Sequence, residues 1–111
     1  MRKFVAVAVL LAVSSTPVFA YDLVVNNTSE YDIHELYVSK SKSSKWGPDQ
    51  LQKQTIDAGE KFTLRNIADG IYDLKIVDED ETECIIENVE FSESKEWKLT
   101  SKIMEKCDAE N

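Results

Sequence analysis

The strongest constraint on the fold is a two-residue alternation of apolar and polar side chains, interrupted by turn-forming residues about every 8 to 12 positions. The alternation is clearest where Phe62 and Leu64 are separated by polar neighbours. Successive side chains of a strand point to opposite faces of a sheet, so this pattern is typical of strands with one buried face. The chain is therefore predicted to be all-β: a small antiparallel β-sandwich or barrel-like domain with about six or seven short strands.

The expected strands follow one another with short connections. They cover residues 23–25, 33–39, 61–66, 71–77, 84–91 and 95–100, while 51–56 is expected to form an edge strand or one turn of helix. Residues 33–39 break the alternation, which predicts a bulge or burial on both faces. Ala68, Asp69 and Gly70 are predicted to form a hairpin-type turn. Residues 101–111 are expected to be a short polar tail with one helical turn at most.

The first twenty residues have the order of a cleavable secretory signal peptide. Arg2 and Lys3 precede an apolar run over residues 4–13, and small residues follow where a signal peptidase cuts. The run has about half of the ~20 residues that a membrane-spanning helix needs, and an uncleaved anchor is the alternative. We predict a cleaved signal at 1–20 and a single domain at 21–111 without a membrane span, located in the periplasm or secreted.

Two cysteines, Cys84 and Cys107, lie in the expected mature domain. In an oxidising compartment an even pair predicts one disulfide bond, and two free thiols are the alternative. A domain of this size is only marginally stable, and closing this loop would stabilise it by about 3 kcal/mol.

The chain is acidic, with a formal net charge of −8, and loss of Arg2 and Lys3 with the signal makes it two units more negative. Such a charge repels phosphate backbones and anionic lipids, which argues against nucleic-acid and membrane-surface partners. A protein or a glycan of the cell envelope is the expected partner. Solubility alone is the alternative explanation of the charge.

No catalytic motif is recognisable in the sequence. His34 is the only histidine, no Gly-x-Ser-x-Gly elbow occurs, and Gly47, Gly59 and Gly70 lie in separate turns rather than in a phosphate-binding loop. The chain is therefore predicted not to be an enzyme. An unseen catalytic set around His34 and a neighbouring carboxylate is the alternative.

The acidic segment 78–83 is the candidate metal site. Asp78, Asp80 and Glu83 are candidate ligands for calcium, which prefers six to eight oxygen ligands. The alternative is a solvated acidic hairpin that discourages aggregation between sheet edges. No other cofactor is expected.

The loop at residues 39–50 is the candidate binding segment, and it is locally basic. Lys45, Trp46 and Asp49 are its candidate contact residues, because an exposed tryptophan is the side chain most enriched at binding hot spots. The alternative is that Trp46 caps one end of the core.

Four segments together resemble a group of small, uncharacterised bacterial exported proteins. They are VNNT at 25–28, IHELYVS at 33–39, WGPDQL at 46–51 and YDLKIVDEDETE at 72–83, followed by Cys84. The resemblance implies a periplasmic or secreted β-sandwich and transfers no functional residue. The chain departs from the group's pattern at Glu81, where glycine is frequent, and at Ile71, where cysteine is frequent.

These observations predict an exported, non-enzymatic binding or accessory domain. One alternative is an immunity or inhibitor protein directed against a basic partner, since a small acidic domain suits electrostatic blocking. The other alternative is a calcium-dependent structural module.

Overall fold

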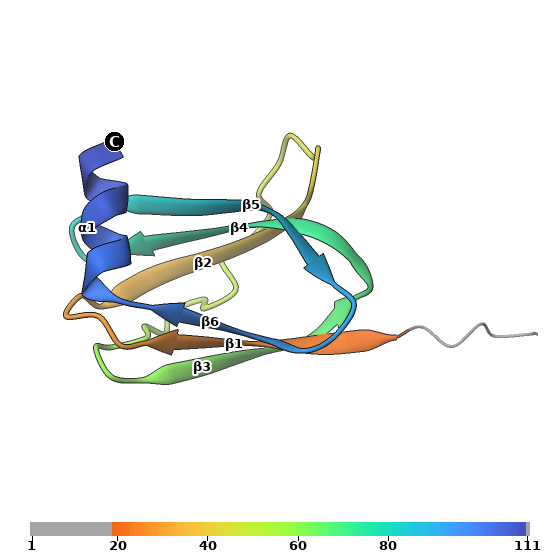
Figure 1. Cartoon of the computed structure of the whole chain (residues 1–111), viewed down its shortest axis with the longest axis horizontal. Coiled ribbons are helices and arrows are strands. Elements are labelled where there is room, and N and C mark those ends of the chain that lie inside the picture. The colour runs from red at the N-terminus through yellow and green to blue at the C-terminus, as the bar shows by residue number, and fades with distance from the viewer. Residues whose placement is uncertain (1–18, 111) are drawn as a thin grey trace, which may run out of the picture.

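The computed structural model describes residues 19–110, which form six strands and one helix (Figure 1). The expected signal peptide lies outside the described residues except for Phe19 and Ala20. The elements are β1 (Ala20–Asn27), β2 (Ile33–Lys40), β3 (Lys61–Ala68), β4 (Gly70–Asp78), β5 (Glu83–Phe91), β6 (Lys95–Leu99) and α1 (Ser101–Glu110). No helix within residues 19–110 is long and apolar enough to cross a membrane.

The strands form two three-stranded sheets, which confirms the all-β prediction. One sheet has the order β3-β1-β6 and the other has the order β2-β4-β5 (Figure 1). All pairs are antiparallel except β1 with β6, which run parallel. The predicted irregularity of the second strand is also found, because the β2–β4 register shifts between Ile33 and Glu35.

The connections cross from one sheet to the other except between β4 and β5, which form a hairpin. The predicted hairpin at Ala68, Asp69 and Gly70 is therefore wrong. Only Asp69 separates β3 from β4, so the chain turns a corner between the sheets instead of folding back on itself. The Tyr72 hydroxyl donates to the Ala68 carbonyl over 2.8 Å across this corner.

The core lies between the two sheets. The inward-facing residues of both central strands are buried, as the alternation predicted for Tyr72, Leu74 and Ile76. The Tyr72 ring meets Phe91 edge to face, with centroids 5.6 Å apart. The largest fully buried apolar side chains are Phe91, Leu23, Ile33, Leu36, Leu51, Ile56, Leu74, Ile76, Leu99, Met104 and Val25.

The segment at 51–56 forms neither a strand nor a helical turn. It makes turns and a single bridge from Ile56 to Ile33 at the edge of β2. Asn27, which is fully buried, holds it in place: its Nδ2 donates to the carbonyls of Tyr31 at 2.7 Å and Ile56 at 2.9 Å. A buried amide needs such partners because an unmet hydrogen bond in the core costs about 1–3 kcal/mol.

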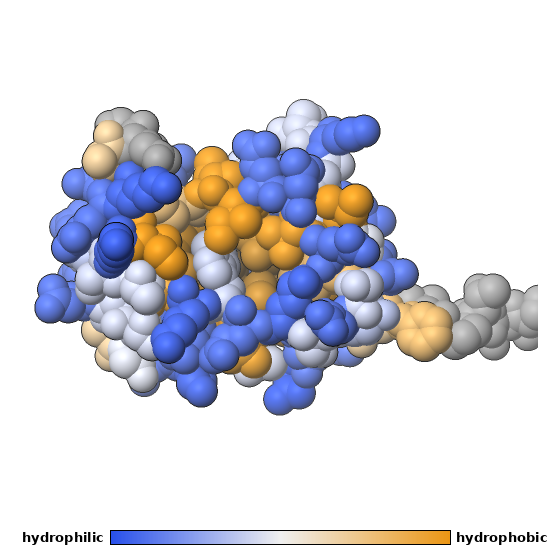
Figure 2. Space-filling view, in the orientation of Figure 1, coloured by the Kyte–Doolittle hydropathy of each residue, from blue (hydrophilic) through white to orange (hydrophobic). Residues whose placement is uncertain are grey.

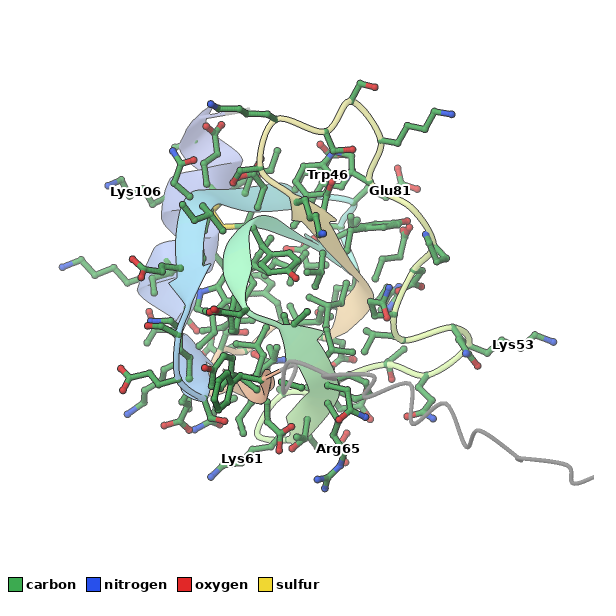
Figure 3. The ribbon with its side chains drawn as sticks, turned by 90° about the vertical axis from the view of Figure 1, so that its right-hand side faces the viewer. Trp46, Lys53, Lys61, Arg65, Glu81 and Lys106 are labelled. Carbon is green, nitrogen blue, oxygen red and sulfur yellow. A yellow bond between two sulfur atoms is a disulfide. The ribbon has the colours of Figure 1, made fainter. Side chains whose placement is uncertain are left out.

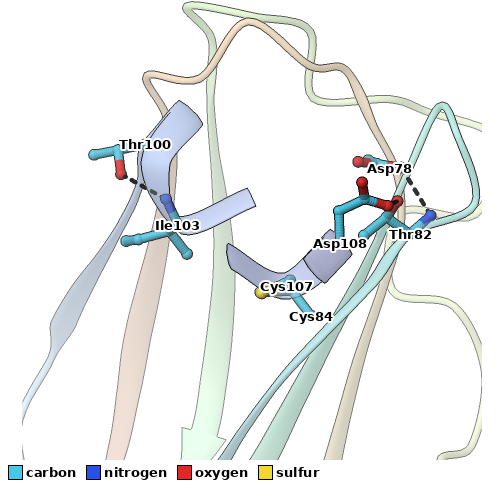
Figure 4. Close-up of a disulfide and its surroundings, with 7 residues drawn as sticks. All are labelled: Asp78, Thr82, Cys84, Thr100, Ile103, Cys107 and Asp108. Atoms are coloured by element: carbon cyan, nitrogen blue, oxygen red, sulfur yellow. Dashed lines mark hydrogen bonds between the residues drawn. A yellow bond between two sulfur atoms is a disulfide. The ribbon is translucent and has the colours of Figure 1, made fainter. Parts of the chain in front are cut away.

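The C-terminal segment differs from the expected tail, because it forms the ten-residue helix α1. The Thr100 hydroxyl accepts from the Ile103 amide over 3.2 Å at the start of the helix (Figure 4). Met104 is 1% exposed and extends the core from this helix. The predicted disulfide bond is present and joins Cys107 of α1 to Cys84 of β5, with Cα atoms 5.3 Å apart (Figure 4).

We predict that replacing both Cys84 and Cys107 by serine lowers the melting temperature by about 12 to 24 °C. The bond spans 23 residues, and closing a loop of this size raises the free energy of unfolding by about 3 kcal/mol. For a domain this small, each kcal/mol shifts the melting temperature by about 4 to 8 °C. Thermal unfolding followed by circular dichroism measures the change. The parent treated with reductant should melt at the same temperature as the double variant, and the double variant should not respond to reductant. Equal melting temperatures of the untreated parent and the double variant would contradict the prediction.

Candidate functional site

The outer face of the β2-β4-β5 sheet is the candidate functional site. The strand registers place its outward-facing residues in rows that run across the three strands. We call the surface around the centre of these rows the Trp46 face. The rows, from the α1 end onward, are Glu35, Val77 and Glu83; then Tyr37, Lys75 and Ile85; then Ser39 and Asp73; then Ile71 and Glu90.

Lys75 lies at the centre of this face between two aromatic rings. Its Nζ is 4.7 Å from the centroid of Tyr37 and 4.9 Å from the centroid of Trp46. The Lys75 side chain is only 14% exposed, and its Nζ is 4.0 Å from a carboxylate oxygen of Glu83. A partly desolvated cation over aromatic faces gains about 1–2 kcal/mol. Lys75 therefore holds the half-buried Trp46 against the sheet.

Tyr37 adds a hydrogen bond to the same cluster, because its hydroxyl donates to the Glu35 carboxylate. This bond, with desolvation and the nearby carboxylates Glu35, Asp49 and Glu83, raises the pKa of Tyr37 to about 12. The phenol therefore remains neutral over the physiological range and orients the ring that faces Lys75.

The loop that carries Trp46 is anchored to the sheet by polar side chains. The Ser39 hydroxyl donates to the Lys45 carbonyl at 2.8 Å, and the Ser41 hydroxyl donates to Asp73 at 2.9 Å. The same Asp73 oxygen accepts from the Asn88 amide at 3.0 Å, so it connects the loop to β5 across β4. Figure 3 shows Trp46 inside the loop, on the side of the strands, with Lys53, Lys61 and Arg65 extending away from the protein.

Of the three residues expected to bind a partner, Trp46 and Lys45 lie at the surface, whereas Asp49 is bound to the backbone. Trp46 lies on the outer face of a sheet and is not among the side chains that pack against the core, whereas Trp97 is. The Lys45 side chain is exposed beside it. The Asp49 carboxylate instead accepts from the backbone amides of Leu36 and Leu51, both at 2.9 Å, and closes the end of the loop.

The three expected metal ligands are not brought together. Asp78 is 4% exposed, and one of its oxygens accepts from the amides of Asp80 and Thr82, both at 2.9 Å, which orders the β4–β5 turn. Glu83 instead faces Lys75 on the other side of the sheet. Within residues 19–110, no three His, Cys, Asp or Glu side chains are arranged to hold a metal ion. Calcium binding stays a prediction.

A small cavity of about 70 Å³ lies between the β4–β5 turn and α1, where Asp78 and Asp80 meet Glu105 and Asp108. The Asp108 carboxylate accepts from the Thr82 hydroxyl at 3.2 Å (Figure 4). Burial, followed by the nearby carboxylates, raises the pKa of Tyr31 at the rim of this cavity. The arrangement fastens the turn to the helix beside the disulfide bond.

Two further findings concern residues singled out in the sequence. His34 is exposed at the bulge of β2. Glu81 has a φ of +63° in the β4–β5 turn, the left-handed conformation that glycine adopts most easily.

Sequence reasoning missed Tyr37, Lys75 and Ile85 as neighbours. The alternation that buries Leu74 and Ile76 does place Lys75 on the opposite face. Only the register between strands, which the sequence does not state, aligns it with Tyr37 and Ile85.

We predict that Lys75→Met releases Trp46 from the sheet. The methionine keeps the apolar stem but removes the cation, which costs about 1 kcal/mol and exposes the indole. In a Trp97→Phe background, Trp46 fluorescence should shift to longer wavelength and become more accessible to acrylamide. Lys98→Met on β6, where the lysine is exposed, is the matched control. An unchanged spectrum in the Lys75 variant would refute the cation–π contact.

We predict that Tyr37 ionises near pH 12 and that Glu35→Gln lowers its pKa toward 10. Because the folded pKa is raised, the stabilisation is complete below pH 10 and is lost between pH 10 and 12. The measurement is a pH titration of ¹³Cζ-labelled tyrosines, with Tyr37→Phe assigning the signal and Glu93→Gln as control. A Tyr37 signal that already titrates near pH 10 in the parent would rule out the hydrogen bond.

Comparison with known proteins provides no relative: no family model, no curated protein and no solved structure matches the chain.

Proposed function

We propose that the protein is an exported, non-enzymatic binding domain that holds a basic protein partner on the Trp46 face. The observation that carries the proposal is the combination of an aromatic and aliphatic centre with an acidic rim on one sheet face.

The centre of the face has the residue types of a protein-binding hot spot. Trp46 and Tyr37 are half-buried there, while Ile85 and Ile71 are 47% and 51% exposed. Tryptophan and tyrosine dominate the binding energy of interfaces, and exposed aliphatic side chains gain by being covered. Figure 2 looks at the β5 edge of the sheet, beside the Trp46 face, and shows apolar side chains gathered there with hydrophilic residues around them. Aliphatic side chains favour a protein over a glycan, because sugar rings stack on flat aromatic surfaces.

Three carboxylates lie on the rim of the face, while one exposed cation, Lys45, lies in the loop beside Trp46. Glu35, Glu83 and Glu90 occupy the two outer strands of the sheet, and Glu83 lies near the ammonium of Lys75, the one basic residue in the four rows. The whole chain carries a net charge of −8. Complementary charge speeds association and selects against acidic partners, so the rim favours a basic partner. An inhibitor or immunity protein against a basic enzyme is one form of this function.

Export is part of the proposal, and two observations support it. The N-terminal residues have the pattern of a secretory signal. The Cys84–Cys107 disulfide is of the kind that persists in oxidising compartments and is rare in the reducing cytosol.

Two isoleucine substitutions give a matched test. Ile85→Ser removes an apolar side chain from the Trp46 face, and Ile103→Ser removes one that is 36% exposed on α1. We predict that immobilised parent protein captures basic proteins from an envelope extract, that raised salt releases them, and that they are lost with Ile85→Ser and Trp46→Ala but kept with Ile103→Ser. Loss of a hot-spot residue weakens affinity by about thirtyfold or more.

Quantitative mass spectrometry of the captured proteins provides the readout. The proposal is wrong if the parent captures nothing, if the captured proteins are mainly acidic, or if Ile85→Ser and Ile103→Ser capture the same set.

A further inference from the structure

A groove lies away from the Trp46 face, between the edge strands β2 and β3. It is an open groove of about 330 Å³, within the range of small-ligand sites. Val38 of β2 and Leu64 of β3 form its two walls, and Ile67 and Tyr72 lie along it. Both wall residues are only half-buried although they pack against the core.

The groove exists because the loop after β2 covers only half of the β2 edge. The Gln50 amide donates to the Leu36 carbonyl at 2.7 Å, and Ile56 bridges to Ile33, so the first half of β2 is covered. Val38 lies beyond the covered half. The groove is lined by Ile67 and Tyr72, which belong to the apolar core between the sheets.

The floor of the groove is apolar and held in place. Ile67 and Tyr72 are each 7% exposed. The Tyr72 ring is fixed at one end by its hydrogen bond to the Ala68 carbonyl and on one side by Phe91. A ligand tail can thus contact preformed apolar surface at little conformational cost.

The rim of the groove is polar, and its only charged residue is a cation. Gln50, Arg65 and Asn66 form the rim. A β-bulge in the β1–β3 pair forms the part of the rim that holds Arg65 and Asn66. Tyr21 pairs with Ile67 and Leu23 with Leu64, so Asp22 alone opposes these two residues.

The bulge leaves Arg65 available at the rim. Asn66 has a φ of +63°, the left-handed conformation that asparagine tolerates in turns and bulges. The Arg65 side chain is 72% exposed, and its Nη1 is 3.7 Å from Asp22, too long for a strong hydrogen bond. Its guanidinium donors therefore remain available to a ligand.

From this geometry we propose that the groove binds a small amphiphile with an anionic head, such as a medium-chain carboxylate. The alkyl tail lies on Ile67 and Tyr72 between Val38 and Leu64, and the head accepts hydrogen bonds from Arg65 and the rim amides. Charge complementarity selects the anion, because Arg65 is the one ionised side chain lining the groove. The site is separate from the Trp46 face, so both can be occupied at once.

The test compares two probes of equal tail length and opposite charge, octanoate and octylammonium, added to the purified protein below micelle-forming concentrations. Amide chemical shifts are followed by ¹H–¹⁵N NMR. We expect octanoate to shift the signals of Val38 and residues 64–68 saturably and to bind up to about fivefold more tightly than octylammonium. Arg65→Gln should remove that preference, since an exposed charged contact is worth up to about fivefold in affinity.

The groove walls provide the second arm of the test. Leu64→Gln should abolish octanoate binding. If this variant does not fold, the milder Val38→Thr, which keeps the side-chain shape, replaces it and should weaken octanoate binding severalfold. Ile103→Ser on α1, where Ile103 is 36% exposed and lies outside both surfaces, should leave octanoate binding unchanged.

Three results would overturn the proposal. They are no saturable shift with octanoate, shifts centred on the Trp46 face, or equal binding of octanoate and octylammonium. None of them affects the capture of basic proteins on the Trp46 face, so the two proposals fail independently.

Discussion

The Cys84–Cys107 disulfide bond is the constraint that holds α1 against one end of the sandwich. It fixes α1 to β5, an edge strand that has a neighbour on only one side in its sheet. With the helix in place, Met104 reaches the core and Asp108 accepts a hydrogen bond from Thr82. A domain this small buries too little apolar surface to hold a short helix by packing alone, so a covalent link matters more than in a larger protein.

The crossing topology explains why two different surfaces are available. Because the chain changes sheet at most connections, the loop between β2 and β3 has to travel from one sheet to the other. Its first part, with Trp46, folds onto the outer face of the β2-β4-β5 sheet, and its last part, with Ile56, pairs with the edge of β2. The groove begins where this coverage ends. One loop thus shapes both the Trp46 face and one rim of the groove.

Six acidic residues of the chain show two different roles. Asp49, Asp73 and Asp78 accept hydrogen bonds from backbone amides and order a loop, a bulge and a turn. Short side chains suit this task because aspartate reaches nearby backbone groups with little loss of conformational freedom. Glu35, Glu83 and Glu90 instead lie on the outer face, where their longer side chains surround the aromatic centre. A high acid count by itself therefore overstates the negative charge available to a partner.

The sequence by itself determined the fold class, the positions of most strands and the disulfide partners, because alternation, turn residues and a single cysteine pair are local or countable signals. Thr100 and the spacing of Met104 and Cys107 also carried a weak helix signal that the polar composition of the last residues concealed. Only the tertiary structure decided which turn is a hairpin and that the Asp49 carboxylate orders the loop after β2. It also decided that Asp78 and Glu83 lie on opposite sides of a sheet. The row formed by Tyr37, Lys75 and Ile85 was likewise visible only there. The physical reason is that strand register and sheet order are set by packing between residues far apart in the chain, which a local pattern does not encode.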